Sequence, residues 1–243
     1  MIKRIFLLCV ASLLVFTGCG PKQKPEEKPA AVLIEEGLTQ FDKGDHREAI
    51  ATFTKIKDWY PFSKHAITAE LKTADAHFAL KEYDEAIMAY ESFVNLHPRN
   101  EAAPYVIYQI GQCYLEQLRK VDQDQTSAQK AHDTFQRLLK QFPDGPYTQP
   151  AEEGIKTCRK SILAHELYIA KFYLKGKHYK AALKRFNGIL SMYPDVGAQY
   201  EALGYIAQCE SSLALTEAVE AKKKAEAPEM KNIAVTKENA ARK

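Results

Sequence analysis

The chain contains 243 residues, of which 46% are hydrophobic and 27% are charged, a composition that is ordinary for a helical globular protein. Its formal net charge at pH 7 is +3, which gives no support for bulk nucleic-acid binding. Beyond the N-terminus, no apolar run in the sequence is long enough to cross a bilayer.

The N-terminus has the layout of a secretory signal. Lys3 and Arg4 precede an apolar run from Ile5 to Phe16, and small residues then lead to Cys19. A cysteine at this place resembles the lipobox of bacterial lipoproteins, so residues 1–18 are predicted to be a signal peptide and Cys19 the lipidated first residue of the mature chain. An ordinary signal or a short membrane anchor is the alternative. No aspartate follows the cysteine to suggest retention in the inner membrane. We therefore expect the lipid to anchor the chain in the outer membrane.

Residues 19–31 are predicted to form a tether. The segment is polar, and a proline recurs at every fourth position: Pro21, Pro25 and Pro29. It has too little apolar surface to fold by itself. At roughly 3 Å per residue, a semi-extended tether lets the first folded unit stand a few tens of ångströms from the lipid.

The rest of the chain repeats one helical pattern four times. Each copy has a small residue, an aromatic residue four positions later, an apolar residue three positions after that, and then a proline. The copies are Ala49, Phe53, Ile56 and Pro61; Ala86, Tyr90, Phe93 and Pro98; Ala131, Phe135, Leu138 and Pro143; and Ala182, Phe186, Ile189 and Pro194. Upstream of each lies an amphipathic segment with a small residue of its own: Gly37, Ala74, Gly111 and Ala170. This is the tetratricopeptide pattern, which has roughly 34 residues per unit.

We therefore predict an all-α fold, a tetratricopeptide-repeat solenoid of about five helix-turn-helix units over residues 32–227. The units lie near 32–63, 67–100, 104–145, 150–196 and 197–227. A polar insertion at 121–127 interrupts the third unit, and one long helix over 150–174 joins the third unit to the fourth. Pro228 is expected to stop the last helix, and residues 228–243 are expected to form a disordered tail.

No arrangement of residues predicts a catalytic site, a metal site or a cofactor. His165 and Glu166 begin like a zinc-protease motif, but Ile169 stands where the second histidine is required. Asp122 and Asp124 alone are too few ligands for a calcium site. The cysteines within the repeats are expected to be buried thiols rather than parts of a disulfide framework: Cys113, Cys158 and Cys209.

A groove for another polypeptide is the remaining functional feature. In stacked helical hairpins the first helices line the concave side, and their inward positions can be counted from the small residue. In the first three units these positions are mostly apolar or aromatic, which suits an extended peptide that carries aromatic residues. They are Ile34, Leu38, Phe41, Leu71, Phe78, Tyr108 and Gln112, together with Asp75 and Leu115. The alternative is that neighbouring helices pack against some of these side chains. The fourth unit is more basic, with Lys171 at a matching position.

Several segments carry a specific resemblance to a known family. They are Trp59-Tyr-Pro-Phe-Ser63, Lys120-Val-Asp-Gln-Asp-Gln125, Phe142-Pro-Asp-Gly-Pro-Tyr147 and Tyr193-Pro-Asp195. With the lipobox, the tether, the insertion and the long joining helix, they resemble the ComL/YfiO family, also called the BamD family. Its members are lipoprotein subunits of the outer-membrane β-barrel assembly machinery.

This resemblance implies a non-enzymatic scaffold on the periplasmic face of the outer membrane. The N-terminal repeats would receive the aromatic-ended targeting signal of unfolded outer-membrane proteins, and the C-terminal repeats would dock on a POTRA domain of the barrel-forming insertase. Arg185 falls where the family places a docking arginine, and Lys171 is grouped with it as a docking residue. Other lipoproteins of the assembly complex would be further partners. The alternative is a different periplasmic repeat lipoprotein, either a pilus-assembly pilotin or an adaptor for cell-wall hydrolases.

Overall fold

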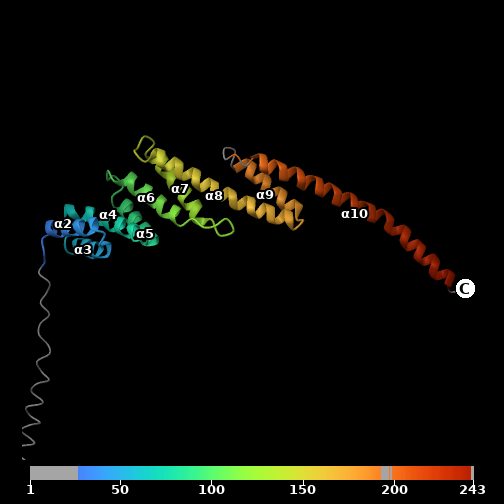
Figure 1. Ribbon diagram of the computed structural model, residues 1–243, viewed down its shortest axis with the longest axis horizontal. Helices are drawn as coiled ribbons and strands as arrows, with labels where there is room; N and C mark the ends of the chain where they lie inside the picture. Colours follow the sequence, from blue (N-terminus) through green and yellow to red (C-terminus); the bar gives the residue numbers. More distant parts are fainter. Residues whose placement is uncertain (1–26, 193–196, 198, 242–243) are drawn as a thin grey trace, which may run out of the picture.

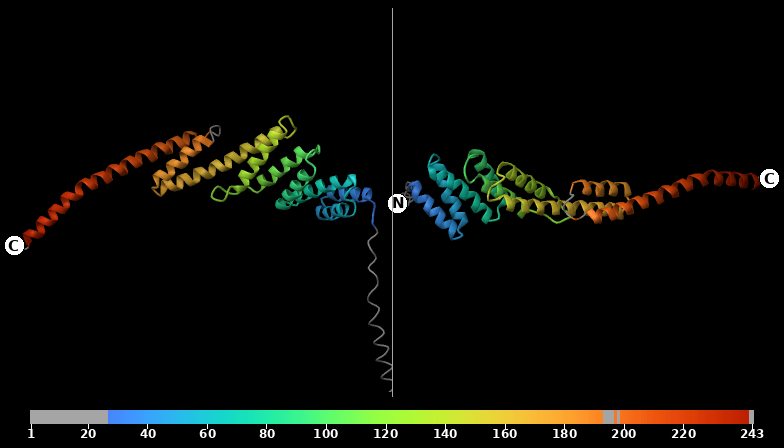
Figure 2. Two further views of the ribbon diagram at one scale, coloured as in Figure 1. Left: turned by 180° about the vertical axis from the view of Figure 1, so that it is seen from behind. Right: turned by 90° about the horizontal axis from the view of Figure 1, so that it is seen from above.

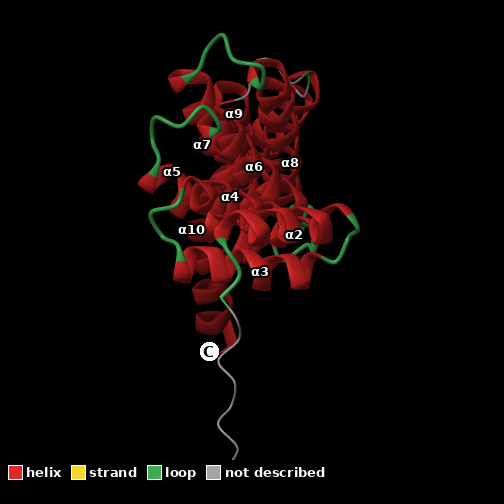
Figure 3. Cartoon of the chain, turned by 90° about the vertical axis from the view of Figure 1, so that its left-hand side faces the viewer, coloured by secondary structure: helices red, strands yellow, loops and turns green. Residues whose placement is uncertain are grey.

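The computed structural model describes residues 27–192, 197 and 199–241, and every regular element in this part of the chain is a helix (Figure 1). The helices are α2 (Ala30–Asp42), α3 (His46–Trp59), α4 (Lys64–Ala79), α5 (Tyr83–Leu96), α6 (Ala103–Glu116), α7 (Thr126–Gln141), α8 (Thr148–Lys175), α9 (Tyr179–Met192) and α10 (Gln199–Ala241). Each packs against the next, which produces an elongated stack of hairpins (Figures 1 and 2). Viewed along the stack, the connecting loops lie at its periphery (Figure 3). The prediction of an all-α repeat fold is confirmed. In the described chain the first four predicted units are hairpins, whereas the fifth is the single helix α10.

Glycines set against aromatic rings bring the helices close together. A Cβ atom added at Gly37 would lie 2.4 Å from Cε1 of Phe53, and one added at Gly111 would lie 2.3 Å from Cε1 of Phe135. The other edge of Phe135 meets Gly154 of α8, where an added Cβ would lie 2.5 Å from Cε2. Since real Cβ atoms do not approach so closely, these helices can pack at this separation only where a residue has no side chain.

The core runs along the stack as four clusters rather than as one centre. The aromatic residues of the repeated pattern are all 0% exposed: Phe53, Tyr90, Phe135 and Phe186. Each of them belongs to a different cluster. A core of this kind fixes each hairpin mainly against its neighbours, as in other solenoid proteins.

Helix α8 is long enough to serve two hairpins. Its first part shares a core cluster with α7 through Ala151 and Cys158, and its last part shares another with α9 through Leu163 and Ala170. The prediction of one long helix at this place is confirmed. Residues 121–125 of the predicted polar insertion lie in the loop between α6 and α7, and its last two residues, Thr126 and Ser127, begin α7.

The last helix extends further than the sequence predicts, and the structure corrects this boundary. We expected Pro228 to end it and a disordered tail to follow, whereas α10 continues through Pro228 to Ala241. A proline inside a helix removes one backbone hydrogen bond. The residues from 214 to 226 are all exposed, so water can reach the carbonyl that the proline leaves without its usual donor. The alanine, lysine and glutamate residues around this position are strong helix formers.

Residues 1–26 fall outside the described part of the chain. The signal peptide over 1–18, the lipidation of Cys19 and most of the tether therefore stay predictions. The end of the tether is held in place, because the hydroxyl of Tyr60 donates a hydrogen bond of 3.1 Å to the carbonyl oxygen of Lys28. Among the described helices, none combines the length and the hydropathy that crossing a membrane requires.

Candidate partner-binding surfaces

The predicted groove residues lie on α2, α4 and α6, the first helices of the first three hairpins. Seven of them are half-buried, and we call this set the N-terminal surface: Leu38, Phe41, Leu71, Phe78, Tyr108, Gln112 and Leu115. Ile34 is only 6% exposed and shares a core cluster with Phe53 of α3 and Ala69 of α4. Its place in the groove is therefore corrected: the second hairpin covers Ile34, and its side chain stabilises the core instead.

Aromatic rings pack in two groups at the N-terminal surface. The ring of Tyr108 stacks on that of Tyr147, with centroids 5.1 Å apart and an interplanar angle of 24°. Tyr147 also contacts Tyr105 at 5.9 Å, and Phe78 packs edge-on against Tyr83 at 5.7 Å. Burial raises the pKa of Tyr108 above its ordinary value, so its ring stays neutral. Neutral, partly exposed rings of this kind suit contact with apolar or aromatic side chains of another chain.

A buried carboxylate connects the helices beneath this surface. Asp75 of α4 is 7% exposed, and its Oδ1 accepts hydrogen bonds from the hydroxyls of Tyr90 at 2.7 Å and Tyr105 at 2.9 Å. Its Oδ2 accepts from Nζ of Lys72 at 2.8 Å, and that ammonium lies 5.0 Å from the ring centroid of Phe41. Burial, with the Asp75 carboxylate next, raises the pKa of Tyr105 to about 12, so its hydroxyl remains a donor at neutral pH. These contacts connect α4 with α5 and α6, and through Lys72 with α2.

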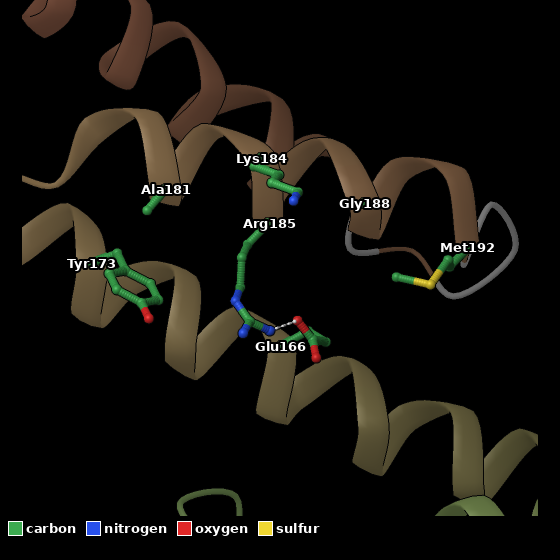
Figure 4. A pocket seen from close by; sticks show the side chains of 7 residues that line it. All are labelled: Glu166, Tyr173, Ala181, Lys184, Arg185, Gly188 and Met192. Atoms are coloured by element: carbon green, nitrogen blue, oxygen red, sulfur yellow. Dashed lines mark hydrogen bonds and ion pairs between the residues drawn. The ribbon is translucent and has the colours of Figure 1, made fainter.

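The fourth hairpin contains a pocket of about 400 Å³ beside Arg185 (Figure 4). Arg185 extends from α9 toward α8, where its Nη1 donates a hydrogen bond of 2.7 Å to Oε2 of Glu166. The remaining lining residues are Tyr173, Ala181, Lys184, Gly188 and Met192. The side chain of Arg185 is 38% exposed. Because a guanidinium has five N–H donors in a planar fork, it can bind a second carboxylate while it keeps the first.

Lys171 makes a separate set of contacts. Its Nζ lies 2.5 Å from Oε1 of Glu201 and 5.2 Å from the ring centroid of Tyr205, both on α10. The hydrogen bond from Lys171 to Glu201 raises the pKa of this lysine, so it remains charged. The structure therefore does not bring Lys171 and Arg185 into one pocket, because the first side chain contacts α10 and the second crosses between α9 and α8.

The possible metal ligands and the cysteines of the described chain were also located. No group of three or more His, Cys, Asp or Glu side chains within it is placed to hold a metal ion. The three cysteines of the repeats are free and buried, as predicted: Cys113, Cys158 and Cys209. Burial raises the pKa values of Cys113 and Cys158 to about 12, which makes these thiols poor nucleophiles.

We compared the sequence of this chain with known protein families. The YfiO family model, described as "Outer membrane lipoprotein", matches residues 26–225 of this chain. The chain belongs to this family. The matched range takes in every hairpin described above and the first part of α10. The resemblance predicted from the sequence is thus confirmed.

Three relatives show how far the similarity extends, and each carries the name outer membrane protein assembly factor BamD. The protein of Rickettsia prowazekii is 30% identical over 212 residues, which cover 86% of this chain and 84% of the relative. That of Haemophilus influenzae is 29% identical over 226 residues, with coverage of 88% and 86%. That of Pasteurella multocida is 28% identical over 208 residues, with coverage of 82% and 80%.

Proposed function

We propose that this protein is a non-enzymatic scaffold in outer-membrane protein assembly. It is held on the periplasmic face of the outer membrane by lipid attached to Cys19. Membership of a family of outer membrane lipoproteins, and relatives that carry the name of an outer membrane protein assembly factor, support this proposal. At roughly 3 Å per residue, the tether from Cys19 to Pro29 gives the first hairpin a reach of about 30 Å from the lipid.

In this proposal the N-terminal surface receives extended segments of unfolded outer-membrane proteins. Phe41, Phe78 and Tyr108 offer partly exposed rings against which aromatic side chains can pack. Lys72 adds a cation beside the ring of Phe41, and 32% of its side chain is exposed. An extended chain that ends in an aromatic residue and a terminal carboxylate complements both features. The Asp75 contacts already connect the helices that carry these side chains, which lowers the cost of ordering the surface on binding.

The pocket beside Arg185 is the single observation that carries the docking half of the proposal. Its lining combines an arginine, a lysine and a tyrosine with the small residues Ala181 and Gly188, so it can admit a side chain from another protein. The hydrogen bond to Glu166 already orients the guanidinium, which lowers the entropic cost of docking. In our proposal a POTRA domain of the barrel-forming insertase supplies the carboxylate that binds there. Lys171 and other lipoproteins of the assembly complex contribute contacts outside this pocket.

Charge reversal at Arg185 tests the docking site. In Arg185→Glu the new carboxylate would face Glu166 and repel the partner's carboxylate. We expect capture of the barrel-forming subunit from solubilised membranes to fall at least ten-fold, which corresponds to about 1.4 kcal/mol. Far-UV circular dichroism should be unchanged, because the side chain is partly exposed. Lys55→Glu on the exposed side of α3 makes the same change of charge and serves as the control. Equal capture by the parent protein and Arg185→Glu would remove this pocket from the docking site.

A further inference from the structure

Residues of one helical face form a continuous stripe along α8. They follow one another at alternating steps of four and three: Ala151, Ile155, Cys158, Ile162, His165, Ile169 and Phe172. His165 is the only polar member of this series. Steps of four and three keep side chains on one face of a helix, and this spacing is typical of a helix that packs along a second helix.

Helix α7 covers only the first part of this stripe. Ala151 and Cys158 are 0% exposed, and they lie in one core cluster with Phe135 and Leu138 of α7. Ile155 packs against the same cluster. The contact that the stripe predicts is therefore formed over three of its seven positions, all at the N-terminal end of α8.

The C-terminal end of the stripe is only partly covered: His165 and Ile169 are half-buried, and Phe172 is exposed. The loop before α7 reaches as far as His165, whose Nδ1 lies 2.7 Å from the carbonyl oxygen of Val121. Beyond that contact, Phe172 is 66% exposed, and Tyr168, one turn before it, is 47% exposed. We call the last three stripe residues, together with the adjacent Tyr168, the open stripe: His165, Tyr168, Ile169 and Phe172.

The position of Phe172 is buried in the neighbouring hairpins. It lies two residues after the small residue of its helix, and Cys113 holds the same place in α6. Cys113 is 0% exposed and shares a cluster with Phe93 of α5, the second helix of the preceding hairpin. In α10, Cys209 lies two residues after Ala207, which we align with Gly111; Cys209 is 0% exposed and shares a cluster with Phe186 of α9. In α8 the preceding helix, α7, packs at Cys158, fourteen residues before Phe172, so no helix of the described chain is left to cover the open stripe.

The charge around the open stripe indicates what could cover it. Residues 154–192 contain nine lysines and arginines and one acidic residue, Glu166. The loop that reaches His165 adds Asp122 and Asp124, and Lys171 and Lys180 pair with Glu201 and Glu217 of α10, so the surroundings of the open stripe are basic on balance. Glu166 already pairs with Arg185. Lys175 lies one turn after Phe172 and is exposed. An apolar helix face within a basic region complements a partner whose own apolar face is bordered by carboxylates.

We propose that the open stripe of α8 docks an amphipathic helix of another protein that carries acidic residues along the edges of its apolar face. The occupant is a helix because helices fill the equivalent position on α6 and α10, where α5 and α9 pack. It takes the place along α8 that α7 would occupy if α7 were longer. This site does not depend on the docking proposed at Arg185, since none of the open-stripe residues lines that pocket.

The test uses the full lipidated chain in nanodiscs of neutral lipid and two fluorescent helical peptides as probes. Both peptides carry the same leucine stripe at steps of four and three, but one has glutamate and the other lysine along its edges. By fluorescence anisotropy, we expect the glutamate peptide to bind at least ten-fold more tightly than the lysine peptide. Phe172→Glu should weaken binding of the glutamate peptide at least ten-fold. Phe62→Glu, at a residue 101% exposed in the turn after α3, should leave it unchanged.

Every other result overturns the proposal. Equal binding of the glutamate peptide to the parent protein and Phe172→Glu would show that the open stripe is not the binding face. Tighter binding of the lysine peptide would contradict the inferred charge of the partner. Binding to phosphatidylglycerol vesicles that Phe172→Glu abolishes would identify a lipid-facing surface. Self-association in sedimentation equilibrium that Phe172→Glu abolishes would identify a second copy as the occupant. Tyr168→Glu, at the other exposed ring, provides an independent variant for each measurement.

Discussion

Replacing Asp75 with alanine removes the acceptor that joins three helices under the N-terminal surface. Tyr90 is 0% exposed, so in Asp75→Ala its hydroxyl would lose its partner in a site that bulk water does not reach. A buried donor without a partner costs about 1–3 kcal/mol. Tyr105 and Lys72 are half-exposed and can bond to water instead. The loss of each of their hydrogen bonds to Asp75 therefore adds at most about 1 kcal/mol to the destabilisation. We therefore expect Asp75→Ala to lower the free energy of unfolding by about 2–4 kcal/mol.

A double-mutant cycle with Tyr90→Phe tests the origin of this loss. When both residues are changed, no buried hydroxyl is left without an acceptor. The double variant should therefore be more stable than the sum of the two single effects predicts, by about 1–2 kcal/mol. The measurement is urea unfolding at pH 7, followed by far-UV circular dichroism. Asp58→Ala, at an exposed residue of α3, is the control and should change stability by less than about 0.5 kcal/mol. A loss below 1 kcal/mol for Asp75→Ala, or additive effects in the cycle, would refute this reasoning.

Two further predictions concern helix packing and membrane anchoring. Gly111→Ala forces a Cβ atom into the ring of Phe135 and should destabilise the protein by about 1–3 kcal/mol. Gly204→Ala, with no atom within 4 Å of the added Cβ, should instead stabilise it by up to about 1 kcal/mol; urea unfolding would contradict the packing argument if both shifts had the same sign. Cys19→Ala should move the protein from the detergent phase to the aqueous phase in a phase-partitioning assay, and unchanged partitioning would rule out lipidation at Cys19.

The hairpins could be predicted from the sequence because their determinants are local. A small residue, an aromatic residue four positions on and an apolar residue three positions later all lie on one helix, and the rings of Phe53 and Phe135 fill the space that Gly37 and Gly111 leave open. The long helix α8 was predictable for a similar reason, since no proline or glycine interrupts it after Gly154.

The partly predicted features depend on contacts between residues far apart in the chain. Asp75 was expected on the inward face, but its partners Tyr90 and Tyr105 are 15 and 30 residues away, and only the stacking of hairpins brings them together. Ile34 was misplaced because, like Leu71, it lies three residues before the small residue of its helix. This position in the sequence does not show that the next hairpin covers the side chain of Ile34. The pair between Arg185 and Glu166 likewise depends on how α9 crosses α8.

The central claim is that the N-terminal surface binds segments of unfolded outer-membrane proteins. Photo-crosslinking from position 78 tests it most directly, with a crosslinking amino acid in place of Phe78 in the full lipidated chain and an unfolded outer-membrane protein as the probe. The account predicts an adduct that maps by mass spectrometry to the C-terminal segment of the unfolded protein, and little adduct from the exposed control position 62. No adduct from position 78, or equal adducts from positions 78 and 62, would contradict the claim.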